Sequence, residues 1–348
     1  MLPSLTARRL QAQRITTPVA ASPADAVRHM AAMQAQDYHA ALWAVGLRTA
    51  DATLAQVEDA IARGEIVRTW PMRGTLHLLA REDVRWMVAL LAPRVQAANA
   101  ARIARDVGFD APALAHGRQV MEQALRDGVP VARSELYARM DAAGIASGNQ
   151  RGLHLLNWLA HESVLCQGPR HGKQPTFVLM DAWVPPSAPL GRDEALHRLA
   201  LRYLQGHGPA TVADLAWWSG LTQKDALHAL NLAAPALGHE TRDGATWWWR
   251  ADAPATSRSR TFHLLPAFDE YLIGYRDRTP VLDAAHTRRV FGVNGLVAAT
   301  AIIRGRVAAT WKREAGGGVT LDPLRTLDDA EHAGIQHAAQ RWQRFLRG

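Results

Sequence analysis

The sequence has little of what disulfides, zinc sites and membrane spans are built from. Its single cysteine, Cys166, excludes an intrachain disulfide, and no paired CxxC or HExxH spacing is present to bind zinc. The longest apolar run, Leu296 to Ile303, is far too short to cross a bilayer. The segment from Met1 to Gln13 lacks the apolar core of a signal peptide. We therefore expect a cytoplasmic protein with no metal, no cofactor and no membrane association.

Lysine is also scarce. The 40 basic residues include only three lysines, Lys173, Lys224 and Lys312. The basic side chains exceed the 32 acidic ones, which gives a formal net charge of +8. Arginine binds phosphate in a bidentate geometry, so this charge suits a nucleic-acid surface. An alanine- and arginine-rich chain from a GC-rich genome would show the same bias, so charge alone leaves DNA binding open.

The composition of the 348 residues, 48% hydrophobic and 21% charged, is that of a folded chain, and the length suggests two or three modules. One order of secondary-structure elements recurs along the chain. In the clearest copy, a helix from Val212 to Trp218 breaks at Ser219-Gly220 and Thr222 caps a second helix. A hairpin from Leu237 to Arg250 follows, with its turn at Asp243-Gly244. Helix, turn, helix and hairpin is the order of a winged helix.

Two further copies lie upstream. In the second copy we expect helices Ser134 to Ala143 and Asn149 to Glu162, then strands Val164 to Gln167 and Thr176 to Met180 around a basic tip. In the first copy we expect helices Pro23 to Gln34 and Leu54 to Arg63, then strands Ile66 to Pro71 and Thr75 to Leu79. The sequence therefore predicts a mainly α-helical protein with small β hairpins, an α+β fold with three tandem winged-helix motifs.

The remaining chain is expected to form a connector and a closing module. Residues 81–126 are read as all-helical, and the C-terminal part as a strand meander followed by a helix from Leu327 to Leu346. Alternation in the middle strand places Val307, Ala309 and Trp311 on one face and Arg306, Thr310 and Lys312 on the other.

Four segments of the chain resemble a known family: Met33-Gln34-Ala35-Gln36-Asp37, Arg68 to His77 (RTWPMRGTLH), Pro266 to Tyr275 (PAFDEYLIGY) and Gly305 to Trp311 (GRVAATW). They are similar to the bacterial AlkZ and YcaQ family of DNA glycosylases, and the resemblance covers essentially the whole chain. It implies three winged helices in a C-shaped arrangement around a DNA cleft. It also implies excision of N7-alkylated purines from double-stranded DNA and, in several members, unhooking of interstrand crosslinks.

This resemblance sets the expected domain boundaries and location. We expect the first winged helix with the glutamine motif in residues 1–80, a helical connector in 81–130, the second winged helix in 131–185, the third in 190–255, and the meander with its closing helix in 256–348. The protein is expected to associate with the nucleoid during repair.

The AlkZ-like branch carries Gln-x-Gln as its catalytic motif, where the YcaQ-like branch has Gln-x-Asp. Here the motif reads Gln34-Ala35-Gln36, so the resemblance implies that Gln34 and Gln36 are catalytic. In an unbroken helix, positions i and i+2 point about 200° apart and cannot share one substrate. The helix that begins at Pro23 must therefore end or distort near Met33, or the two glutamines play different parts.

Such weak groups suffice when the leaving base is already cationic. An N7-alkylguanine departs without a general acid, so the enzyme needs to hold water beside C1′ and stabilise an oxocarbenium ion. A glutamine amide can accept from that water and donate to sugar or phosphate, although it cannot act as a base. Asp37 could act as a base, but an exposed carboxylate or helix cap is the favoured interpretation. His77 is divided between packing and an auxiliary role in the site.

With three lysines in all, a Schiff-base lyase is not expected, so the enzyme should be monofunctional and leave an abasic site. Bulky adducts cannot rotate fully into a snug pocket, which favours an open cleft. Each exposed cation is, taken alone, more typical of a solvated surface charge than of a DNA contact. The candidate DNA contacts are the cations expected to be exposed on the hairpins and on the meander: Arg73, Arg170, Lys173, Arg306, Lys312 and Arg313.

Other polar and aromatic residues are given structural roles. Trp70 is expected in the core, and packing is expected for Trp217, Trp218 and the run Trp247-Trp248-Trp249. Asp269 and Glu270 are expected to pin a loop through arginines such as Arg276 and Arg278.

Two alternatives stay open. A non-enzymatic winged-helix transcriptional regulator would explain the modules and the charge equally well, but not the glutamine motif. Such regulators usually dimerise on palindromes, and no heptad pattern or other clear dimerisation element is seen, so a monomer is expected. A relative that keeps the fold and has lost activity or changed its adduct is the other alternative.

Overall fold

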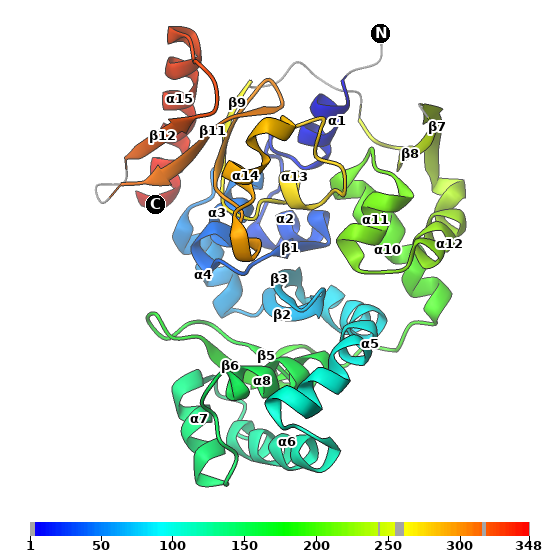
Figure 1. The fold of residues 1–348 in the computed structure, drawn as a ribbon, viewed down its shortest axis with the longest axis vertical. Coiled ribbons are helices and arrows are strands. Elements are labelled where there is room, and N and C mark those ends of the chain that lie inside the picture. Colours follow the sequence, from blue (N-terminus) through cyan, green and yellow to red (C-terminus); the bar gives the residue numbers. More distant parts are fainter. Residues whose placement is uncertain (1–3, 243, 255–260, 315–317, 348) are drawn as a thin grey trace. The chain divides into compact units, whose positions relative to one another are not determined.

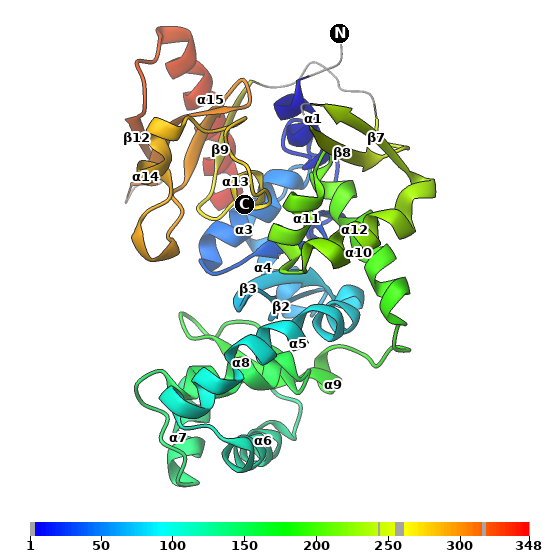
Figure 2. The ribbon, with the colours of Figure 1, turned by 45° about the vertical axis from the view of Figure 1, so that its right-hand side comes forward.

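The computed structural model describes residues 4–242, 244–254, 261–314 and 318–347 (Figures 1 and 2). Two compact units make up the chain: residues 60–195, here called the middle unit, and residues 1–59 with 196–348, here called the terminal unit. Both combine helices with small antiparallel sheets, as expected for the α+β class. No helix in the described ranges is long and apolar enough to span a membrane.

The middle unit contains a sheet in which the first two predicted hairpins lie side by side. Its antiparallel strands are, in order, β3 (Thr75–Ala80), β2 (Ile66–Met72), β5 (Leu165–Gln167), β6 (Thr176–Leu179) and β4 (Val131–Ala132). Arg68 lies opposite Gln167, and their side chains are hydrogen-bonded at 2.8 Å. The first hairpin therefore contributes to the same core as the second copy.

Helices cover this sheet and complete its core. They are η1 (Arg81–Asp83), α5 (Val84–Arg102), the π-helical turn η2 (Ile103–Val107), α6 (Ala111–Leu125), α7 (Arg133–Ala142), α8 (Arg151–His161) and α9 (Met180–Trp183). The order α7, α8, β5 and β6 is the helix, turn, helix and hairpin expected for the second copy. Trp70 is buried and stacks on Phe177 with ring centroids 6.3 Å apart, which confirms its core position.

The terminal unit begins with α1 (Leu5–Ala12), α2 (Pro23–Met30), β1 (Ala32–Gln34) and α3 (Tyr38–Arg48). Helices α4 (Leu54–Ala62) and α10 (Arg192–His207) each cross into the middle unit. The predicted helix from Pro23 to Gln34 was too long, because it ends at Met30. Helix α3 was not predicted.

The third copy has the predicted form. Helices α11 (Val212–Ser219) and α12 (Gln223–Ala233) are followed by the turn η3 (Ala234–Ala236) and the hairpin of β7 (Leu237–Arg242) and β8 (Ala245–Arg250). Thr222 caps α12 by accepting from Asp225 N at 3.0 Å, as expected, whereas Asp243 of the predicted turn lies outside the described residues.

The tryptophans of this copy pack in different ways. Trp218 is fully buried, which confirms its packing role, whereas Trp217 is 45% exposed and donates from Nε1 to Ile273 O at 3.1 Å. Trp248 is buried in the hairpin, and the guanidinium groups of Arg9 and Arg8 lie over the rings of Trp247 and Trp249.

The C-terminal module is a four-stranded antiparallel sheet beside a long helix. The strand order is β12 (Val319–Pro323), β11 (Arg306–Arg313), β10 (Thr300–Ile303) and β9 (Phe262–Leu265), and α15 (Asp329–Arg347) lies beside it in both views. Four short helical turns lie between β9 and β10: α13 (Glu270–Ile273), η4 (Ala284–His286), α14 (Thr287–Val290) and η5 (Val293–Gly295). Trp311 is buried beside Trp342, with ring centroids 5.7 Å apart, as the predicted alternation requires.

Helices α3 and α15 approach closely at Gly46. A Cβ atom at this position would lie 2.3 Å from Cε2 of the buried Phe345 ring, so the two helices could not keep their spacing. We expect Gly46→Ala to lower the free energy of unfolding by about 1–3 kcal/mol, the usual range for overpacking. Urea denaturation would measure the change. Gly148→Ala, where a Cβ meets nothing within 4 Å, is the control and should have little effect.

Candidate active site

The glutamine motif follows α2, with Gln34 at the end of a short strand and Gln36 in the bend that leads to α3. Helix α2 ends at Met30, and β1 carries the chain to Gln34. Met33 and Ala35 are buried, whereas Gln34 is half-buried and Gln36 is exposed. Exposure alternates along residues 33–36, as on an extended chain, and places both amides toward the outside of the terminal unit. The predicted need for the helix to end before the motif is confirmed.

A strained turn at Ala31 redirects the chain from α2 into β1. Ala31 has φ 64° and ψ −56°, close to a γ-turn conformation that is rare for residues with a Cβ. Its N–H donates to Arg28 O at 3.2 Å. The backbone of α10 packs against the end of α2, because a Cβ at Gly206 would lie 3.0 Å from His29 O. The surrounding packing therefore holds a conformation that the chain would otherwise avoid.

Asp37 closes the motif and begins the next helix. Its Oδ1 accepts from Ala40 N at 3.0 Å, and the side chain is exposed. The favoured interpretation of Asp37 as a helix cap is confirmed. Because the cap fixes where α3 starts, it also fixes the end of the glutamine segment.

A buried carboxylate anchors the backbone of the motif. Gln34 N donates to Glu270 Oε1 at 2.8 Å, and Glu270 is 1% exposed. Its other oxygen, Oε2, accepts from Trp218 Nε1 at 3.0 Å and contacts His207 Nε2 at 3.3 Å. Glu270 therefore joins β1, α10 and α11 at the start of α13. These three partners were not predicted.

His207 stands between two oxygens. Nδ1 lies 3.2 Å from Tyr203 O, and Nε2 faces Glu270. His207 therefore connects the backbone of α10 to the Glu270 carboxylate that holds the motif.

Two buried ion pairs stabilise the segment around α13 that carries Glu270. Arg48 binds both oxygens of Asp269 at 2.9 Å, with both side chains fully buried. Asp269 Oδ1 also accepts from Tyr271 N at 2.9 Å and so caps α13. Arg9 donates to Asp214 at 3.2 Å, and Asp214 in turn accepts from the backbone of Arg276. Asp269 thus has the predicted pinning role, but its partner is Arg48.

Arg278 makes contacts within the same part of the terminal unit that were not predicted. Arg278 donates from Nε to Leu272 O at 3.1 Å and lies over the Trp217 and Phe291 rings. Arg48 and Trp218 were missed as partners because each is separated from its carboxylate by more than fifty residues.

His29, at the end of α2, makes the stability of this region depend on pH. Its Nε2 contacts Ala12 O at 2.6 Å, and burial lowers its pKa from 6.5 to about 4 despite that contact. The folded state binds fewer protons than the unfolded state between these values, so stability present above pH 6.5 is lost as the pH falls toward 4. At pH 5 the loss is about 2 kcal/mol. We expect His29→Gln, which retains a donor, to flatten this dependence in urea titrations at pH 5 and 7; an unchanged slope would contradict it.

The turn of the first hairpin brings Arg73 and His77 together in the middle unit. Arg73 and Gly74 both have positive φ (55° and 70°), as in a type I′ turn. His77 is fully buried; Nδ1 lies 2.9 Å from Thr75 O, and Nε2 lies 3.1 Å from Arg73 Nη2. Nδ1 must therefore donate, and Nε2 accepts from the guanidinium. His77 is neutral in this arrangement and orients the half-buried Arg73.

The other predicted DNA contacts differ in how exposed their side chains are. Lys173, Arg306, Lys312 and Arg313 are exposed, as expected. Arg306 also donates to Pro280 O at 2.8 Å. Arg170 is half-buried and donates to Lys173 O at 2.5 Å, so it stabilises the wing turn in addition to carrying charge. The prediction of full exposure was wrong for Arg73 and Arg170.

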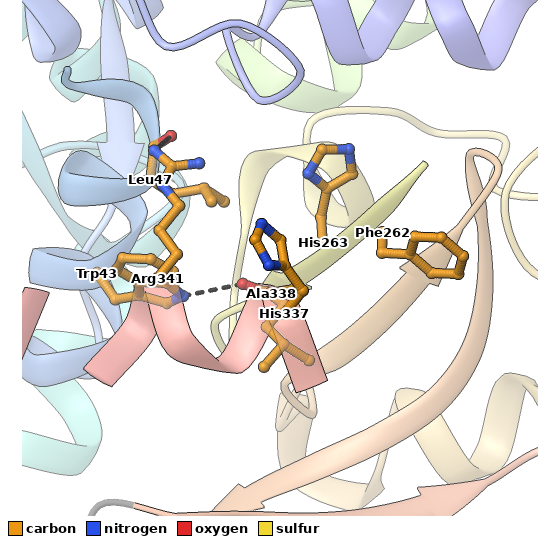
Figure 3. Close-up of a pocket in the computed structure, with 8 residues that line it drawn as sticks. Trp43, Leu47, Phe262, His263, His337, Ala338 and Arg341 are labelled. Carbon is orange, nitrogen blue, oxygen red and sulfur yellow. Dashed lines mark hydrogen bonds between the residues drawn. The ribbon is translucent and has the colours of Figure 1, made fainter. Parts of the chain in front are cut away.

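A small pocket of the terminal unit lies between α3, β9 and α15 (Figure 3). Trp43 Nε1 donates to Leu264 O at 2.9 Å within it; His263 is buried, whereas His337 is exposed. The described residues that line it include none of the predicted site residues, so it is not the candidate active site. Across the described ranges, no group of three His, Cys, Asp or Glu side chains is placed to hold a metal ion.

Comparison with known proteins identifies similarities over most of the chain. A family model described as DNA glycosylase AlkZ-like matches residues 27–345. An interstrand DNA cross-link repair glycosylase of Streptomyces sahachiroi is 28% identical over 330 residues, which are 87% of this chain and 85% of the relative. The solved structure of Streptomyces sahachiroi DNA glycosylase AlkZ matches with a TM-score of 0.82 at 24% identity, covering 99% of this chain and 97% of that one. This last likeness shows a shared fold.

Proposed function

Because the chain belongs to the AlkZ-like family of DNA glycosylases, we propose that it hydrolyses the N-glycosidic bond of cationic N7-alkylated purines in double-stranded DNA and leaves an abasic site. The observation that carries this proposal is the pair of amides, Gln34 and Gln36, on one side of an extended segment whose backbone is held by Glu270. Because the family is one of enzymes, a non-enzymatic regulator is no longer favoured.

In the proposed reaction, positioning replaces acid catalysis. The alkylated base carries a positive charge, so breaking the C1′–N9 bond returns the electron pair to a neutral leaving group. One amide oxygen accepts from the water that attacks C1′, and the amide N–H groups donate to the sugar or an adjacent phosphate. The proton lost by the water passes to solvent or to a neighbouring acceptor, since an amide is not a base.

The relative's name extends the proposed substrates to larger adducts. The curated relative is named as an interstrand cross-link repair glycosylase, and an open, outward-facing amide pair suits a base that cannot rotate into a closed pocket. We propose that this enzyme also accepts bulky N7 adducts or crosslinks, acts as a monomer, and has no lyase step.

A base-release assay tests these proposals. Duplex DNA carrying N7-methylguanine or a nitrogen-mustard crosslink is incubated with the protein, and half of each sample is treated with alkali. We expect strand breaks after alkali and intact strands without it. Breaks without alkali would overturn the monofunctional assignment. Shape-selective binding with no base release from either substrate would overturn the glycosylase proposal and favour an inactive relative.

A further inference from the structure

A basic groove opens at the end of α3 opposite the glutamine motif. It is lined by the loop after α1, the turn between α3 and α4, and the last turns of α15, including Arg341, Arg344 and Arg347. The C-terminal end of α15 lies beside α3 in both views (Figures 1 and 2). Among its described lining residues, Asp51 is the one acidic side chain against these three arginines.

The three arginines differ in how they are used. Arg341 donates from Nη2 to Leu47 O at 2.5 Å and to Gly46 O at 3.4 Å, so it caps α3. Arg344 and Arg347 are exposed and three residues apart, which places them on one helix face. No carboxylate within the described ranges forms an ion pair with either of them. Their charges are directed to solvent at the groove.

A buried hydroxyl also borders the groove. Thr16 is 4% exposed, and its Oγ1 has no hydrogen-bond partner in the part of the chain that the structure describes. By contrast, Thr49 Oγ1 donates to Val45 O at 2.9 Å. A hydroxyl donor beside guanidinium groups is the combination that proteins use to bind phosphate oxygens.

The position of the groove relates it to the motif. Helix α3 begins at Tyr38, directly after the glutamine segment, and ends at Arg48. Its 11 residues span roughly 16 Å at 1.5 Å per residue. Duplex DNA rises 3.4 Å per base pair, so this separation between the motif and the groove corresponds to roughly five base pairs of duplex.

We propose that this groove binds backbone phosphates of the duplex about five base pairs to one side of the lesion. The inference rests on the proposed function, because the motif defines where the lesion lies. Arg344 and Arg347 supply the charge. The contact is independent of sequence and extends the footprint beyond the winged helices.

The variant Arg344→Gln/Arg347→Gln tests the proposal, with Arg105→Gln/Arg139→Gln as a control that removes the same charge from exposed arginines elsewhere. Binding to lesion-free duplex is measured over a range of salt. We expect the groove variant to lose about 1 to 2 from the log–log salt slope, about 0.9 per phosphate, while the control keeps the wild-type slope. Equal slopes for all three proteins would overturn the proposal.

Shortened duplexes locate the contact. The flank on each side of an N7-methylguanine is cut in turn from about ten to about three base pairs, on either side of the proposed five. We expect wild type to lose severalfold affinity when one particular flank is short, and the groove variant to bind both lengths equally. Loss on both flanks in both proteins, or saturable binding of inorganic phosphate with no effect on DNA, would overturn the proposal. If the wild-type protein releases no base, the proposed glycosylase function is contradicted. The salt dependence of DNA binding tests only the proposed phosphate contact in the groove.

Discussion

Replacing both motif amides, as Gln34→Ala/Gln36→Ala, is expected to reduce the release of N7-methylguanine by about 10³-fold or more, since removing one positioned donor from an active site typically costs 10²–10³-fold. The two amides face the same side and act on the same water and sugar, so their effects should not be additive. Single-turnover base release under saturating enzyme measures the chemical step directly.

The matched control is Gln336→Ala/Gln340→Ala, which removes two exposed amides from α15. It should retain wild-type base release. Both double variants should bind lesion-free duplex with nearly wild-type affinity, because the motif is proposed to act on the reaction and not on general DNA binding. Full activity of Gln34→Ala/Gln36→Ala would contradict the proposed catalytic role of the two glutamines.

Glu270→Gln is expected to lower the stability and the rate together. One amide oxygen can still accept from Gln34 N, but the new NH₂ group then faces the Trp218 N–H and His207, which leaves buried donors unpaired. Breaking one partner of a buried charged cluster costs about 3–5 kcal/mol. We also expect kcat per folded molecule to fall about tenfold or more, because a misplacement of 1 Å at the motif can cost 10²-fold.

Urea denaturation and single-turnover rates at a temperature where the variant is folded separate the two effects. Glu331→Gln is the control, because Glu331 is also a buried, hydrogen-bonded carboxylate, but it accepts from Arg325 at 2.7 Å at the start of α15. This control should keep the wild-type rate. A folded Glu270→Gln enzyme with a normal rate would show that Glu270 stabilises the fold without positioning Gln34.

The sequence predicted local elements well where one residue decides the outcome. Thr222 begins α12, and the Arg73-Gly74 dipeptide turns the first hairpin. Geometry predicted that the helix ends or distorts near Met33 or that the two glutamines play different parts, and the helix ends at Met30. Helix α3 could have been predicted, because Asp37 is a good N-cap and the apolar run that follows is typical of a buried helix.

The supports of the site could not be predicted in the same way. Glu270 meets Gln34 across 236 residues, and Arg48 meets Asp269 across 221. Nothing local distinguishes a carboxylate that binds a distant backbone N–H from one that binds an arginine nearby. The strained Ala31 is likewise set by packing against α10, because alanine in a sequence normally favours a helix.

The extended backbone at the motif has a consequence for insertions and for related chains. Side chains alternate along a strand, so adding one residue between Gln34 and Gln36 would rotate the second amide toward the protein interior. Under the proposed mechanism, such an insertion would leave only one of the two amides able to reach the sugar. A chain that carries the same three letters within an uninterrupted helix would lack this chemistry.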